Sequence, residues 1–186
     1  MHWVIGIDEA GRGPLAGPIS IGAVAMPLEQ NDWKFWKGLK DSKQLTEKQR
    51  EAWFARMREE NIIHAVSLIS SSIIDSAGLT RAATRGCMQV LKQLELEPPE
   101  AHLLLDWGLF VPRTWRQERL VKGDERIPAI ALASIVAKVT RDRHMCKVHE
   151  RFPEYGFAQH KGYGTAMHYK ALTKHGPCAI HRRSFL

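Results

Sequence analysis

Cysteine is scarce in this chain of 186 residues, and long apolar runs are missing. The three cysteines, Cys87, Cys146 and Cys178, lie far apart and include no CxxC pair, which argues against a disulfide framework and against a zinc site. No apolar stretch approaches the length that spans a bilayer, so we expect no membrane contact. The first residues lack the basic region, apolar core and cleavage site of a secretory signal, and a cytoplasmic location is the default expectation.

The composition that remains is ordinary for a globular protein, but its charge is unevenly placed. With 44% hydrophobic and 25% charged residues, the chain can bury a core without disulfides or metals, and we expect one domain and a monomer. The net charge is +7, and the segment from Lys138 to the end contains ten Lys or Arg residues and three acids. This basic segment is typical of a protein that binds a polyanion such as nucleic acid, although a basic surface can also be only a solvated face.

Short apolar runs alternate with helical patterns along the chain. The capping box of Thr46 and Gln49 marks one helix start, and Pro98-Pro99 ends another helix. The patterns predict strands at 3–8, 19–26, 62–69, 102–106 and 118–122, and helices at 46–61, 79–94, 128–144 and 165–174. Alternating strands and helices indicate an α/β fold, in which the first two strands pair as a hairpin.

Two acidic residues stand at the end of the first predicted strand. Asp8 and Glu9 follow an apolar run and lead into the glycine-rich loop 10–18. Carboxylates beside a backbone almost bare of side chains suit a divalent metal ion held against a phosphate. Because neighbouring residues of a strand point to opposite faces, both cannot face one metal from a regular strand. Either the strand breaks there, or one residue contributes through its carbonyl or a water; Asp8 is favoured as the central ligand.

Two further acids are expected to join this pair. Asp106 ends another apolar strand, and Asp124 lies in a loop just ahead of the helix that begins near Pro128. Carboxylates that crowd together repel one another, and a bound Mg²⁺ or Mn²⁺ relieves the repulsion. Taken singly, each acid is better explained as a turn former or a helix cap. Their combination with the glycine loop favours the metal site.

Six blocks of sequence stand out in order along the chain, at residues 6–18, 41–45, 122–124, 133–142, 162–165 and 181–185. Together they resemble the ribonuclease HII family, the type 2 ribonucleases H. The resemblance covers nearly the whole chain and implies a ribonuclease H-like fold, a central mixed β-sheet flanked by helices with a helical C-terminal part. It also implies a metal-dependent endonuclease that cuts the RNA strand of RNA/DNA hybrids and single ribonucleotides within duplex DNA, leaving a 3′-hydroxyl and a 5′-phosphate.

The resemblance also implies roles for individual residues. The family's four acidic residues fall on Asp8, Glu9, Asp106 and Asp124, which would hold two Mg²⁺ or Mn²⁺ ions. Several other residues would contact the substrate: Gly11, Arg12 and Gly13 near the 2′-hydroxyl, Tyr163 on the neighbouring sugar and the same hydroxyl, and Lys43, Lys161, Arg182 and Arg183 on backbone phosphates.

Plainer interpretations stand beside these roles. Glycines serve turns, a tyrosine between glycines can simply cap a loop, and the two C-terminal arginines can form a solvated tail. Asp142 is expected to pair with the arginines of its own helix. His160, His168 and His181 have a spacing that fits no common zinc site. Trp107 follows Asp106 where many relatives have glycine, so we expect a different turn there. Two rival functions are a hybrid-binding protein without catalysis and another metal-dependent nuclease of the same fold.

Overall fold

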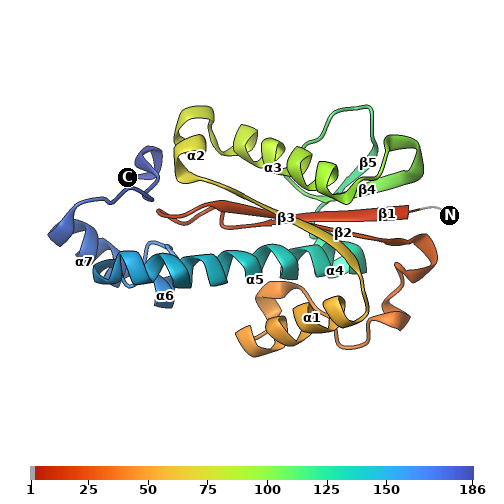
Figure 1. Cartoon of the computed structure of the whole chain (residues 1–186), viewed down its shortest axis with the longest axis horizontal. Coiled ribbons are helices and arrows are strands. Elements are labelled where there is room, and N and C mark those ends of the chain that lie inside the picture. Colours follow the sequence, from red (N-terminus) through yellow and green to blue (C-terminus); the bar gives the residue numbers. More distant parts are fainter. Residues whose placement is uncertain (1–2) are drawn as a thin grey trace.

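A five-stranded mixed sheet in the order β3-β2-β1-β4-β5 forms the centre of the molecule (Figure 1). The computed structural model describes residues 3–186. The expectation that the chain does not begin with a secretory signal therefore falls partly outside the described residues. The strands are β1 (Trp3–Ala10), β2 (Ile19–Pro27), β3 (Ile63–Ile69), β4 (Ala101–Asp106) and β5 (Arg116–Leu120). β1, β2 and β3 pair antiparallel, whereas β4 and β5 run parallel to β1. The predicted hairpin and mixed sheet are confirmed.

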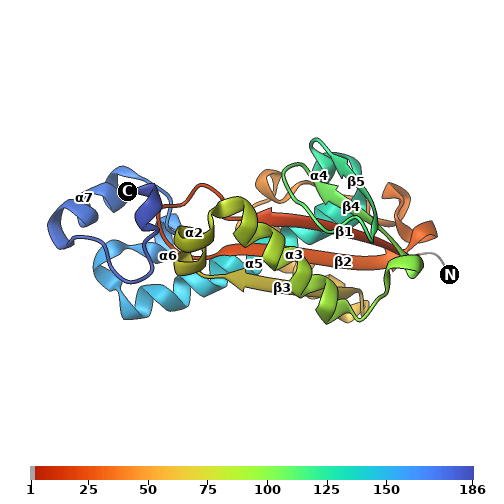
Figure 2. The same cartoon turned by 90° about the horizontal axis from the view of Figure 1, so that it is seen from above.

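Helices cover both faces of this sheet (Figure 1, Figure 2). On one face lie α2 (Ser71–Ala77) and α3 (Leu79–Leu94), and on the other lie α1 (Glu47–Glu59), α4 (Gly123–Arg126) and α5 (Pro128–Arg151). Successive residues of β1 alternate between two cores, since Ile5 and Ile7 pack on the α3 side and Val4 packs on the α5 side. This burial on both faces explains why β1 reads as a continuous apolar run.

Helix α5 lies directly on β1 and β2 because glycines face it. A Cβ atom on Gly6 would lie 2.2 Å from the carbonyl carbon of Ala129, and one on Gly22 would lie 2.3 Å from the carbonyl oxygen of Ala133. Any side chain at either position would push the helix off the sheet. The close contact holds the start of α5, with α4 just ahead of it, over the middle of the sheet.

The element predictions were wrong in a few places. α5 extends to Arg151, beyond the predicted end at 144, because Met145 and Val148 join a third apolar cluster with the C-terminal part. α2 was missed, although Ser70 caps it by accepting a hydrogen bond from the amide of Ile73. The short helices α4 and α6 (Phe157–His160) were also missed, since four residues carry no helical period.

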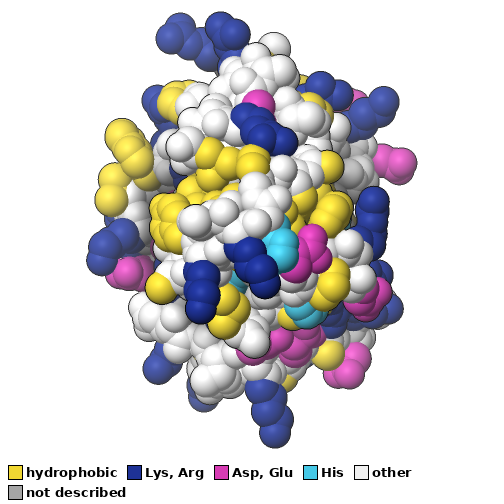
Figure 3. Space-filling model, turned by 90° about the vertical axis from the view of Figure 1, so that its left-hand side faces the viewer, with side chains coloured by type: hydrophobic (Ala, Val, Ile, Leu, Met, Phe, Trp, Pro, Cys, Tyr) yellow, Lys and Arg dark blue, Asp and Glu magenta, His cyan; other side chains and the backbone are white. Residues whose placement is uncertain are grey.

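The C-terminal part, with α6 and α7 (Ala166–His175), packs beside the loop that joins β1 to β2. The amide of Leu15 donates to the carbonyl of Gly162 at 2.9 Å, and the amide of Gly17 donates to that of Ile180 at 2.9 Å. Figure 3 shows this end of the molecule, where Lys and Arg side chains lie around a central group of hydrophobic ones. Across residues 3–186, none of the helices combines the length and apolar character needed to cross a bilayer.

Candidate active site

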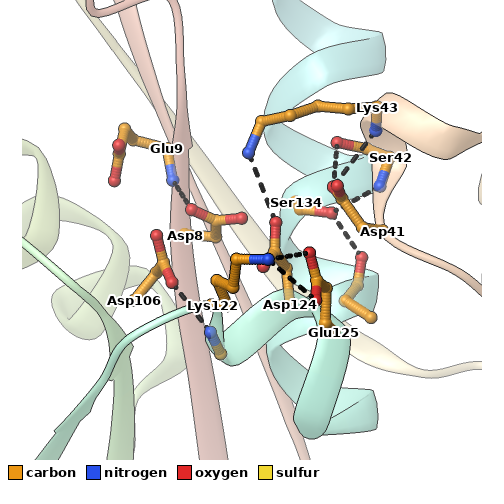
Figure 4. Close-up of polar contacts among 12 residues, drawn as sticks. Asp8, Glu9, Asp41, Ser42, Lys43, Asp106, Lys122, Asp124, Glu125 and Ser134 are labelled. Atoms are coloured by element: carbon orange, nitrogen blue, oxygen red, sulfur yellow. Dashed lines mark hydrogen bonds and ion pairs between the residues drawn. The ribbon is translucent and has the colours of Figure 1, made fainter.

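Three carboxylates meet where β1 and β4 end (Figure 4). Oxygen atoms of Asp8, Glu9 and Asp106 all lie within 4.8 Å of one another. β1 and β4 run parallel, and their pairing ends at Ile7 and Leu105. Asp8 and Asp106, the next residue of each strand, therefore lie at the same edge of the sheet. The structure thus brings together three of the four acids that the sequence pointed to.

Glu9 reaches this group from the opposite face of β1. It continues the row of Ile5 and Ile7 on the α3 side, whereas Asp8 lies on the α5 side. The strand does not break, because its register with β2 continues through Ala10. The amide of Glu9 donates to Oδ1 of Asp8 at 2.7 Å, so the Asp8 carboxylate lies close to the backbone of Glu9. A regular strand therefore does not keep the two carboxylates apart, contrary to the expectation from side-chain alternation.

Burial and mutual repulsion raise the pKa values of these acids. The pKa of Asp8 is raised by burial and then by the charges of Glu9 and Asp106. Burial raises the pKa of Glu9 to about 7, although the guanidinium of Arg12 lowers it from a distance of 3.9 Å. Burial also raises the pKa of Asp106, and the charge of Asp124 adds to the effect. When all three acids are ionised, the group therefore carries more negative charge than its surroundings compensate.

A divalent metal ion fits these residues. The donors are hard carboxylate oxygens, which Mg²⁺ and Mn²⁺ prefer. The Oε2 atom of Glu9 is buried and has no hydrogen-bond partner within the described part of the chain. A cation would supply both the missing positive charge and a partner for this oxygen. Asp8, Glu9 and Asp106 are the residues that offer ligand atoms for it.

Asp124 stands beside the group, on the first turn of α4. The preceding residue, Gly123, donates its amide to Oδ1 of Asp106 at 3.0 Å, which links α4 to the end of β4. The Oδ2 atom of Asp124 lies 3.4 Å from Nζ of Lys43 (Figure 4). The charge of Asp124 contributes to the raised pKa of Asp8. Asp124 thus acts electrostatically on the other acids, although it lies outside their 4.8 Å group.

A further carboxylate near the site, that of Asp41, was not singled out from the sequence. It caps the short helix η3 (Ser42–Gln44) by accepting a hydrogen bond from the amide of Lys43 at 3.1 Å. Burial raises the pKa of Asp41, and the neighbouring Asp124 raises it further. Only the motif at 41–45 signalled this position, and the motif does not tell which of its side chains faces the acids.

Arg182, whose side chain is fully buried, supports the glycine loop through hydrogen bonds. Its guanidinium donates to the carbonyl oxygens of Gly11 at 2.6 Å, Arg12 at 2.7 Å and Gly17 at 3.0 Å. The expectation that Arg182 holds a phosphate at the surface does not fit this position, because the loop occupies its donors. The sequence could not reveal this, since a buried arginine and a surface arginine read alike.

Asp142 does not pair with the arginines of its own helix as expected. It lies 2.9 Å from Nζ of Lys138 and 3.9 Å from the guanidinium of Arg50 on α1. Residues four apart share a helix face and adjacent residues do not, so Lys138 faces Asp142 and Arg141 turns away. Arg141 is fully buried and donates to the carbonyl of Pro18 at 2.9 Å, giving the loop a second support.

Tyr163 lies beside this loop and is 42% exposed. The Nζ atom of Lys138 and the Cζ atom of Arg141 each lie 5.8 Å from the ring centroid. The preceding residue, Gly162, has a φ of 87°, and a Cβ atom there would lie 2.4 Å from the carbonyl oxygen of Ala16. Only glycine permits this approach, which places Tyr163 against the loop.

The remaining basic residues occupy different surroundings. Nζ of Lys161 lies 3.2 Å from Sγ of Cys146, next to the C-terminal part of α5. Arg183 is exposed, and its amide donates to the carboxylate of Asp75 on α2 at 2.9 Å. At the acids themselves, Trp107 follows Asp106 and is 62% exposed. The turn is made at the residue after Trp107, where Gly108 has a φ of 94°.

Comparison with known proteins identifies relatives of this chain. The family model described as ribonuclease HII matches residues 5–186. The ribonuclease HII of Caldicellulosiruptor bescii is 40% identical over 186 residues, which cover this whole chain and 87% of that protein. The ribonuclease HII of Chlamydia trachomatis is 44% identical over 183 residues, which cover 98% of this chain and 81% of that protein. That of Geobacillus kaustophilus is 43% identical over 182 residues, 98% of this chain and 67% of the relative.

Solved structures show the same fold. The ribonuclease H2 of Pyrococcus horikoshii superposes with a TM-score of 0.77 at 27% identity, covering 98% of this chain and 93% of that one. A ribonuclease HIII crystallised with Mn²⁺ gives a TM-score of 0.75 at 20% identity, covering 99% of this chain and 67% of that one. Ribonucleases H depend on divalent metal ions, and the acids at the ends of β1 and β4 can hold such an ion. The chain therefore belongs to the ribonuclease HII family and is a ribonuclease H that acts on nucleic acid.

Proposed function

We propose that this enzyme cuts the RNA strand of RNA/DNA hybrids and also cuts at single ribonucleotides within duplex DNA, leaving a 3′-hydroxyl and a 5′-phosphate. The observation that carries the proposal is the position of the glycine loop. The loop begins directly after Asp8 and Glu9, and its carbonyl groups are turned inward onto Arg182. A metal-binding group and a backbone surface suited to a sugar hydroxyl are thus adjacent in space.

The inward carbonyls determine where the amides point. In a trans peptide the C=O and N–H groups point in opposite directions. The carbonyls of Gly11 and Arg12 face Arg182, so the amides of Arg12 and Gly13 face away from it. A 2′-hydroxyl can accept a hydrogen bond from such an amide, and this hydroxyl distinguishes RNA from DNA. The exposed ring of Tyr163 is close enough to the loop to pack on the adjoining sugar.

The acids would bind the metal ions and align the phosphate. Asp8, Glu9, Asp106 and Asp124 are proposed to hold two Mg²⁺ or Mn²⁺ ions. When bound, two such ions provide activation of water and stabilisation of the leaving 3′ oxygen. Lys43 lies 3.4 Å from Asp124 and is mostly exposed, so its ammonium can turn toward a phosphate beside the acids.

Other basic residues would fix the register of the duplex without reading bases. We assign this role to Lys161 and Arg183, and we assign Arg182 to support of the loop. We propose that the enzyme acts as a monomer. Because its substrate contains DNA, we also propose that it acts in the cytoplasm, in a cell whose DNA lies there.

Cleavage of a duplex DNA with one embedded ribonucleotide tests the proposal. In the presence of Mg²⁺ or Mn²⁺ the protein should cut the ribonucleotide duplex once. The cut should break the bond between the phosphate and the 3′ oxygen, so that the phosphate stays on the new 5′ end. The all-DNA duplex should stay intact. Asp8→Asn or Asp124→Asn should abolish cutting while the circular dichroism spectrum stays unchanged. Duplex binding without cleavage would show a binding protein instead, and efficient cutting of the all-DNA duplex would show a different nuclease.

A further inference from the structure

Three histidines that play no part at the acids are packed together beneath Tyr163. The rings of His160 and His168 stack with centroids 4.6 Å apart, and those of His168 and His181 lie 5.2 Å apart. His168 and His181 are buried, at 0% and 2% exposure. Their Nε2 atoms face each other at 2.9 Å. Within residues 3–186, these histidines and the nearby Cys178 are not among the groups that could hold a metal ion. The cluster therefore needs another explanation.

The hydrogen bonds at the two ends of the His168–His181 pair fix where its protons are. At one end the amide of Cys178 donates to Nδ1 of His181 at 2.9 Å, so this nitrogen carries no proton. At the other end Nδ1 of His168 lies 2.9 Å from the carbonyl oxygen of Tyr163 and must donate to it. A neutral imidazole has one donor and one acceptor nitrogen. The single proton between the rings therefore belongs to Nε2 of His181, and Nε2 of His168 accepts it.

This directed chain of hydrogen bonds joins two segments that shape the substrate side of the site. His181 forms an isolated β-bridge with Ala16, and the next amide, that of Arg182, donates to Leu15 at 2.8 Å. Arg182 is also the residue that turns the carbonyls of the glycine loop inward. At the other end, the carbonyl oxygen that accepts the hydrogen bond from His168 is that of Tyr163 itself. The pair thus connects the loop support to the tyrosine.

We propose that His168 and His181 are positioning residues, which hold Tyr163 and the glycine loop in the mutual geometry that recognises the ribonucleotide. The inference rests on the proposed function of that loop and tyrosine. Neither histidine touches the substrate; each acts through a backbone atom of a neighbour. A satisfied buried network makes its surroundings rigid. Rigidity matters here because a misplacement of about 1 Å can lower a reaction rate about 100-fold.

Asparagine variants separate the links of the chain. An asparagine amide reaches about as far as Nδ1 of histidine, so His168→Asn can keep the bond to Tyr163 and His181→Asn can keep the bond from Cys178. Both variants lose the contact between the two rings. We expect each to lower the single-turnover cleavage rate of the ribonucleotide duplex about tenfold, with duplex affinity in Ca²⁺ within twofold of the wild type. The double variant should be no slower than the slower single variant, because both changes break one contact.

His175→Asn is the matched control, because His175 lies on the same helix as His168 and is exposed. It should cleave at the wild-type rate. Wild-type rates in both single variants would overturn the proposal, and so would rate losses that simply add in the double variant. Equal losses of affinity and rate would show a merely structural role.

A spectroscopic measurement on the unaltered protein does not depend on how the variants fold. Proton–nitrogen correlation spectra at pH 7.5 should show both rings neutral, with the proton of His168 on Nδ1 and that of His181 on Nε2. The opposite tautomer of either ring would overturn the proposal. If the wild type bound the ribonucleotide duplex without cutting it, the proposed function would fail while these tautomers could still be read.

Discussion

Glu9→Gln is expected to stabilise the metal-free protein while abolishing its activity. The pKa of Glu9 is raised from 4.5 to about 7, mainly by burial. The folded state therefore holds the proton more tightly than the unfolded state does, and stability is lost as the pH rises from about 4.5 to about 7. A difference of 2.5 pKa units corresponds to about 3 kcal/mol once the group is fully ionised. Glutamine keeps the shape and removes this cost.

Urea unfolding in EDTA at pH 5 and at pH 8 measures the effect. The free energy of unfolding of Glu9→Gln minus that of the wild type should grow by roughly 2–3 kcal/mol between these pH values. Added Mg²⁺ or Mn²⁺ should stabilise the wild type at pH 8 and so reduce the difference, because a ligand that binds only the folded state stabilises it.

Glu59→Gln serves as the control for this comparison. Glu59 is exposed on α1, away from the acids, and its substitution should give a difference that does not change with pH. The reasoning would be refuted by a Glu9→Gln protein whose advantage over the wild type fails to grow toward pH 8. It would also be refuted if the metal stabilised both proteins equally.

Three further predictions concern the loop and the C-terminal part. Tyr163→Phe should keep part of the cleavage rate, whereas Tyr163→Ala should lose roughly 10- to 100-fold because stacking is lost; equal single-turnover rates in all three forms would remove the tyrosine from recognition. Arg182→Met should lower the free energy of unfolding by roughly 3–5 kcal/mol, since it leaves three carbonyls without their charged donor; urea unfolding checks this, and an unchanged midpoint would contradict it. The pKa of His181 is lowered to about 4 by burial, by His168 and by Arg183; because the unfolded state takes up the proton first, the free energy of unfolding should fall as the pH drops from 6.5 to 4, and less so in His181→Asn.

The sequence predicted the fold well because its strands are apolar and its motifs are local. The runs at β1 and β4 each end in an acid, and parallel pairing alone brings Asp8 and Asp106 to one edge. The antiparallel partner β2 followed from the short glycine loop. Helix α5 was underestimated because its last turns contact the C-terminal part, and such contacts leave no mark in a local pattern.

The sequence said less about the directions of side chains. Alternation along a strand suggested that Asp8 and Glu9 diverge, yet their carboxylates come together just beyond the point where β1 stops pairing with β4. Arg182 looked like a surface charge, because nothing in its neighbours showed that carbonyls more than 160 positions earlier would surround it. The spacing of the histidines gave no sign that His168 and His181 bond to each other, because that contact joins two segments that meet only in the folded chain.

The bonds between Arg182 and the loop have a consequence for the order of folding. They join residues 165 to 171 positions apart in the chain, whereas β1 and β2 are neighbours in sequence and can pair early. During synthesis the acidic strand end would leave the ribosome long before the arginine that shapes the loop. A nascent or prematurely ended chain would then carry carboxylates that can hold a metal ion, but without an ordered glycine loop. Chains that end before Arg182 are therefore expected to lack the loop geometry on which the proposed substrate selection rests.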